Sequence, residues 1–148
     1  MDSRYIIREY SPEDYSQVMN LWIETGLARL ERADSEETIN RTIVRGGKIF
    51  LLVDTETGGI IGTSWISNDG RRLHLQYFAI SVDYQGKGLA HLLLKETLLY
   101  AKKLNMQIKL EVHHTNIRAV NLYKKWGFKY LGDYDIYILR DLSQIPDH

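Results

Sequence analysis

Cysteine is absent from the 148 residues of this sequence, which excludes disulfides, thiolate metal sites and a covalent cysteine intermediate. Proline is scarce: Pro12 and Pro146 are the two in the chain, and no proline-, glycine- or serine-rich linker divides it. No apolar run approaches the roughly 20 residues of a membrane-spanning helix, and the first residues lack the apolar region of a secretory signal. We therefore expect one domain over residues 1–148, located in the cytoplasm.

Net charge is lacking as well. Nineteen basic residues balance nineteen acidic ones, so nothing indicates the electrostatic footprint of a nucleic-acid or membrane surface. Apolar residues make up 44% of the chain and charged residues 26%, which is typical of a globular protein. We expect neither nucleic acid nor a membrane among its partners.

The residue pattern predicts strands and helices in a mixed order. Helices are expected after Ser11-Pro12 and after Ser35, because serine is a preferred helix cap and proline suits the first helical position. Further helices are expected at 89–104 and 117–125. Strands are expected at 5–9, 48–54, 60–67, 73–82 and 108–112, followed by a final hairpin of 130–131 and 134–139. One strand–helix–strand crossover among antiparallel hairpins indicates a mixed α/β fold.

The most informative motif is the glycine turn, residues 85–90, which reads Gln-Gly-Lys-Gly-Leu-Ala. It joins a predicted strand to a predicted helix, whose first N–H groups lack intrahelical acceptors and attract a phosphate or pyrophosphate. The turn lacks the Lys-Ser/Thr pair of a P-loop. His91 stands where a dinucleotide fingerprint has its third glycine or alanine. Both nucleotide interpretations are therefore weak, and a tight turn without a ligand is the simpler alternative.

Residues 85–90 match the pattern Gln/Arg-x-x-Gly-x-Gly/Ala of the GNAT family of N-acetyltransferases. A second series resembles that family's other signature in order and spacing: Leu110-Glu111-Val112, Asn116, Ala119, Leu122-Tyr123 and Gly127-Phe128. The resemblance covers residues 73–139. It implies a central, mostly antiparallel sheet with a splayed parallel pair and helices on both faces. It also implies an acyltransferase that moves an acetyl group from acetyl-CoA to a primary amine of a small molecule, peptide or protein. The amine would attack directly in a ternary complex.

The resemblance further implies where acetyl-CoA, the co-substrate, binds. Its pyrophosphate would be held by the backbone of the glycine turn, and its pantetheine arm would pair with the preceding strand. Asn116 would contact the coenzyme near its pantetheine end, unless it only caps the helix that follows. The coenzyme-binding residues so implied are Phe78, Ala79, Ile80, Gln85, Gly86, Lys87, Gly88, Leu89, Ala90, His91 and Asn116.

Tyr123 stands at the family position of the general acid that protonates the departing thiolate. A phenol suits this role because it is protonated at pH 7, although Tyr123 also fits a core aromatic position. Two residues compete for the role of base, which the amine needs because only its neutral form attacks. Glu111 matches the base of the acetyltransferases that modify the N-termini of ribosomal proteins, and His74 carries an imidazole that suits proton transfer near pH 7. Either could act through water or be an ordinary strand residue.

The acceptor amine is not specified by the sequence. Trp22, residues 25–30 and residues 135–137 are expected to line its pocket, and they show no charge preference that selects a substrate class. His113 and His114 are adjacent, but no third ligand stands at zinc spacing, so we expect no metal. Homodimerisation is frequent in the family, and no feature here decides it. The alternatives are a catalytically silent acyl-CoA sensor, against which the retained Tyr123 and Asn116 argue, and a nucleotide-binding domain.

Overall fold

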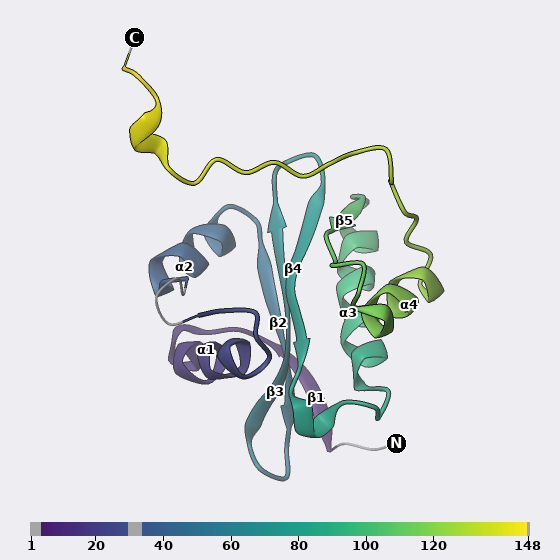
Figure 1. Ribbon diagram of the computed structural model, residues 1–148. Coiled ribbons are helices and arrows are strands. Elements are labelled where there is room, and N and C mark those ends of the chain that lie inside the picture. Colours follow the sequence, from purple (N-terminus) through teal and green to yellow (C-terminus); the bar gives the residue numbers. More distant parts are fainter. Residues whose placement is uncertain (1–3, 30–33, 148) are drawn as a thin grey trace. The chain divides into compact units, whose positions relative to one another are not determined.

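A computed structural model of the chain describes residues 4–29 and 34–147 (Figure 1). Its internal contacts divide the chain into two compact units, Met1–Glu111 and Val112–His148, and each is described by itself. The expectation of a single domain stays a prediction. Residue 30, the end of the first predicted pocket segment, lies outside the described residues.

The first unit is built on a five-stranded sheet whose strands follow one another in sequence order. Each of the first three pairings is antiparallel, and the last, between β4 and β5, is parallel. This confirms the mixed α/β fold and the mostly antiparallel sheet. The strands are β1 (Tyr5–Glu9), β2 (Lys48–Asp54), β3 (Gly59–Asn68), β4 (Leu73–Ile80) and β5 (Ile108–Leu110).

Helices cover both faces of this sheet, as expected (Figure 1). A 3₁₀ turn, η1 (Pro12–Asp14), leads into α1 (Tyr15–Glu24), and Ser35 caps α2 (Glu36–Val44) by accepting from the Thr38 N–H at 3.1 Å. These helices lie opposite α3 (Leu89–Leu104). Successive side chains of β2 point to opposite faces of the sheet and so contact the helices on both. Ile49 and Leu51 belong to the cluster that α1 covers, whereas the Phe50 ring meets Tyr100 of α3 edge-on at 5.8 Å.

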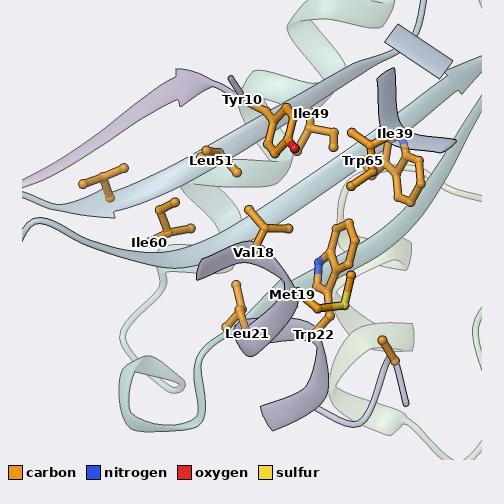
Figure 2. Packing of buried hydrophobic residues seen from close by; sticks show 12 residues of the cluster. Tyr10, Val18, Met19, Leu21, Trp22, Ile39, Ile49, Leu51, Ile60 and Trp65 are labelled. Atoms are coloured by element: carbon orange, nitrogen blue, oxygen red, sulfur yellow. The ribbon is translucent and has the colours of Figure 1, made fainter. Parts of the chain in front are cut away.

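The main core lies between α1 and the sheet (Figure 2). Trp22 of α1 is fully buried, and its ring stacks on Trp65 of β3 with centroids 5.4 Å apart. Both indole N–H groups are satisfied, since Trp22 Nε1 donates to Thr63 Oγ1 at 2.8 Å and Trp65 Nε1 to Thr42 Oγ1 at 2.9 Å. The prediction that Trp22 lines an acceptor pocket is wrong, because packing in the core leaves its side chain no exposed surface.

The second unit contains α4 (Ile117–Lys125) and a 3₁₀ turn, η4 (Leu142–Gln144). Gly127 follows α4 with φ +94°, the left-handed conformation expected after a helix end. The predicted hairpin of 130–131 and 134–139 is wrong: the described part of this unit contains no strand. Alternating apolar side chains favour a strand, but the backbone also needs a partner strand. Here the side chains stay exposed, with Ile136 at 71% and Tyr137 at 90%.

Candidate active site

The parallel pairing of β4 with β5 is short. Leu73, His74 and Leu75 pair with Ile108, Lys109 and Leu110, after which β5 ends while β4 continues to Ile80. Both predicted strands are therefore too long, because residues 82–84 form a 3₁₀ turn, η3 (Val82–Tyr84), and β5 stops two residues early. Phe78, Ala79 and Ile80, the predicted pantetheine contacts, all lie beyond the parallel ladder. An extended ligand adds to a sheet where such a ladder has ended.

A β-bulge formed by Tyr77 and Phe78 stands at the start of this segment. Thr63 pairs with Ala79 but Trp65 pairs with Gln76, so two residues of β4 oppose one residue of β3. One of them, Tyr77, has φ +46°, a conformation that residues other than glycine rarely adopt. The Thr63 hydroxyl donates to the Tyr77 carbonyl at 2.8 Å. Since Thr63 also accepts from Trp22, the core holds the strained backbone in place.

The glycine turn has the backbone that its sequence predicts. Gly86 and Gly88 have φ +80° and +78°, and Gly88 is the N-cap of the 16-residue helix α3. Among the described residues, no side chain caps this helix, and a Cβ added at either glycine would meet no atom within 4 Å. The two glycines therefore leave room for a ligand at the start of α3, where the first N–H groups of a helix lack intrahelical acceptors. The His91 N–H, however, donates to the Gly88 carbonyl at 3.2 Å, which makes it a poorer phosphate donor than expected.

Two side chains fix the path from β4 into the turn. Gln85, predicted to contact the coenzyme, donates from Nε2 to the Ile80 carbonyl at 2.9 Å. Glu24, at the end of α1, accepts from the Ser81 hydroxyl at 2.9 Å and from the Val82 N–H at 3.0 Å. Glu24 carries no signal in the sequence, because its partners lie far along the chain and no motif links them.

A second carboxylate reaches the turn from β2. Tyr84, which directly precedes Gln85, donates its hydroxyl to Asp54 Oδ2 at 2.6 Å. Asp54 is completely buried, and Arg4 donates to its two oxygens at 3.1 Å each. These bonds from Arg4 and Tyr84 hold the pKa of Asp54 far below its usual range, so it is ionised. In the sequence, Asp54 is marked only as an aspartate at the end of an apolar strand, and this does not indicate its bond to Tyr84.

The two candidate bases lie together. His74 on β4 and Glu111, the residue after β5, place Nε2 and Oε1 3.8 Å apart. Both side chains remain accessible, with 40% and 48% of their surfaces exposed. The parallel register explains this proximity, because His74 pairs with Lys109 and Glu111 follows two residues later.

In the second unit, Tyr123 is buried and its ring meets Phe128 edge-on at 5.5 Å. Burial raises the pKa of Tyr123 to about 12, because the charged phenolate is poorly solvated there. Asn116 caps α4 by accepting from the Ala119 N–H at 3.3 Å. The capping role is thus observed, and the coenzyme contact of Asn116 stays a prediction.

The rings of His113 and His114 stack with centroids 4.5 Å apart, and His113 Nδ1 lies 2.7 Å from Thr115 Oγ1. Within residues 4–29 and 34–147, no group of three or more His, Asp or Glu side chains has a metal-binding arrangement. In the same described ranges, no helix has the length and hydropathy needed to cross a membrane.

Comparison with known proteins identifies the family. A model of the acetyltransferase (GNAT) family matches residues 15–128, and the chain belongs to this family. The fold matches an acetyltransferase from Streptococcus agalactiae at 21% identity, covering 95% of this chain and 94% of that one, with a TM-score of 0.74. A GNAT family acetyltransferase from Elizabethkingia anophelis with acetyl-CoA bound matches at 20% identity (86% and 78% covered, TM-score 0.63). Glucosamine-6-phosphate N-acetyltransferase from Arabidopsis thaliana matches at 15% identity (93% and 98% covered, TM-score 0.70). Family and fold support acyl transfer as the class of reaction.

Proposed function

We propose that this protein transfers an acetyl group from acetyl-CoA to a primary amine of a small molecule, peptide or protein. The observation that carries the proposal is the glycine turn. Its left-handed Gly88 opens a long helix that no side chain of the described residues caps, and the turn follows η3 and a strand that outruns its parallel partner. The Elizabethkingia anophelis relative, which has the same fold, was solved with acetyl-CoA bound.

In the proposed complex, the backbone N–H groups of the glycine turn and the ammonium of Lys87 hold the pyrophosphate. Residues 78–80 of β4 pair with the amides of the pantetheine arm. The lone pair of the amine attacks the thioester carbonyl, a C–N bond forms, and the C–S bond breaks to release coenzyme A. No covalent enzyme intermediate forms. The amine loses one proton to a base, and coenzyme A leaves as a thiolate, which takes up a proton from water.

We propose Tyr123 as the donor to the departing sulfur. A pKa of about 12 keeps its hydroxyl protonated throughout the neutral range. The same shift makes the phenol a weaker acid than a thiol, whose ordinary pKa is about 8.5. Tyr123 therefore acts chiefly by donating a hydrogen bond to sulfur as negative charge develops there, since complete proton transfer is uphill.

We propose that the amine proton is accepted at the pair of His74 and Glu111, directly or through water. Support comes from their 3.8 Å separation and from their exposure, which lets a substrate or water reach them. Substitution of Glu111 and His74, singly and together, distinguishes which of them accepts the proton.

The test is a screen of primary amines for release of free thiol from acetyl-CoA. Because the protein has no cysteine, a thiol-reactive chromophore detects only coenzyme A. Acceptor-dependent thiol release is the expected result. A protein that binds acetyl-CoA but releases no thiol with any amine would instead be the silent acyl-CoA sensor. Thermal stabilisation by NAD or ATP, but not by acetyl-CoA, would point to a nucleotide-binding domain.

A further inference from the structure

We propose that Asp54 and Tyr84 are positioning residues for coenzyme binding, which fix the glycine turn and the ammonium of Lys87 before the pyrophosphate arrives. The proposal rests on the proposed use of acetyl-CoA. Neither residue belongs to the glycine turn, and Asp54 comes from β2, a strand that the signature motifs do not include.

The link between the two residues is short and charged. Asp54 is the last residue of β2, and Tyr84 is the last residue of η3, immediately before the turn. Their oxygens lie 2.6 Å apart, a distance typical of a hydroxyl that donates to an ionised carboxylate. Such bonds are roughly twice as strong as neutral ones.

Asp54 is itself held firmly. In addition to the two bonds from Arg4, its Oδ1 accepts from the Glu56 N–H at 3.0 Å. The Arg4 guanidinium balances the buried charge, which would otherwise oppose folding and repel a phosphate. Asp54 is therefore a fixed point to which the start of the turn is tied.

The ring of Tyr84 has a second function. Lys87 Nζ lies 5.2 Å from its centroid, within the range of a cation–π contact. The hydroxyl of Tyr84 thus holds the chain that enters the turn, and its ring restrains the one cationic side chain within residues 85–90. A turn that is already ordered loses less conformational entropy when it binds a ligand.

This role predicts an effect confined to the pyrophosphate end of the donor. Acetyl-pantetheine has the same thioester as acetyl-CoA but lacks the pyrophosphate and the nucleotide. In the Tyr84→Phe variant, kcat/KM for acetyl-CoA should fall about tenfold, mainly through KM. The value for acetyl-pantetheine should not change. Asp54→Asn should produce the same donor-dependent loss.

Tyr5→Phe is the matched control. The Tyr5 ring meets Tyr84 edge-on at 6.4 Å, and its hydroxyl makes no hydrogen bond within the described part of the chain. This variant removes the same atom from the neighbouring ring and should leave both donors unaffected.

Equal losses for the two donors in Tyr84→Phe would overturn the proposal, because they would indicate general damage to the fold. Unchanged kinetics with acetyl-CoA would overturn it too. Calorimetric titration with coenzyme A and with pantetheine makes the same comparison without turnover, so it holds for a protein that binds but does not catalyse. If the wild-type protein bound no coenzyme A, both the proposed function and this inference would be refuted. If the wild type bound coenzyme A and Tyr84→Phe bound it equally well, the inference alone would be refuted.

Discussion

His74 Nε2 on β4 and Glu111 Oε1, in the residue that follows β5, lie 3.8 Å apart. The residues that compete for the role of base are therefore neighbours in space. This relationship changes the expected outcome of mutating them, because residues in contact are not energetically independent.

His74→Ala and Glu111→Gln should each lower kcat by about 10²-fold or more if the pair accepts the amine proton. The double variant should be little worse than the poorer single one. The measurement is the pH–rate profile of all three variants, with His114→Ala as a histidine control. Losses that multiply in the double variant would mean that the two groups act separately.

Tyr123→Phe should lower kcat by about 10²- to 10³-fold, while the Kd for acetyl-CoA stays within error. The phenylalanine fills the same buried space against Phe128 but has no hydroxyl to donate to the departing sulfur. Tyr130→Phe, at a position that is 90% exposed, is the control. If kcat of Tyr123→Phe were unaltered, Tyr123 would not be the donor to the departing sulfur.

Gly88→Ala should weaken both the fold and coenzyme binding. A side chain at φ +78° costs about 1 kcal/mol of unfolding free energy. Asn105→Ala makes a matched comparison, because Asn105 caps the other end of α3 with φ +54°. Both variants should lose stability in urea titrations, but only Gly88→Ala should bind acetyl-CoA more weakly. If the two variants bound acetyl-CoA with equal affinity, the glycine turn would not be part of the coenzyme site.

Thr63→Val should destabilise the protein by about 1–3 kcal/mol, because it leaves the buried Trp22 N–H and the Tyr77 carbonyl without their shared partner. Thr63→Ser retains the hydroxyl and should recover most of that loss. Urea unfolding of the two variants measures the difference. If serine were no better than valine, packing of the methyl group rather than hydrogen bonding would hold the bulge.

Alkaline titration should show a late group of tyrosines. Burial raises the pKa of Tyr10, Tyr77 and Tyr123 to about 12. Because the folded pKa lies above the unfolded value of about 10, their contribution to stability is complete below pH 10. It is lost as pH rises through about 12. Tyrosinate absorbance and unfolding free energy measured over this range test the prediction. Titration of all ten tyrosines as one class near pH 10 would contradict it.

Local signals in the sequence predicted much of the fold. Ser35 caps α2 where a helix start was expected, and Gly127 takes the left-handed conformation that ends α4. Strand ends were predicted less well, because a strand continues only as far as a partner pairs with it. For that reason β5 ends at Leu110, and residues 134–139 do not form the predicted hairpin.

The site was predicted in the same uneven way. The glycine turn is a contiguous motif, so its place at the start of α3 could be predicted, whereas its contact with a coenzyme stays a prediction. Asp54 and Tyr84 could not be predicted, because their hydrogen bond joins positions that no local pattern connects. The left-handed backbone of Tyr77 could not be predicted either. It is held by hydrogen bonds that link Tyr77 to Thr63 and Thr63 to Trp22, and not by the residue's own conformational preference.

The stacked indoles of Trp22 and Trp65 also give the protein a built-in optical probe. They are buried in the first unit, whereas the third tryptophan, Trp126, lies in the second unit with 37% of its surface exposed. In a Trp126→Phe variant, all tryptophan fluorescence comes from the first unit. Comparing its denaturation curve with that of the wild type shows whether the two units melt in one cooperative transition.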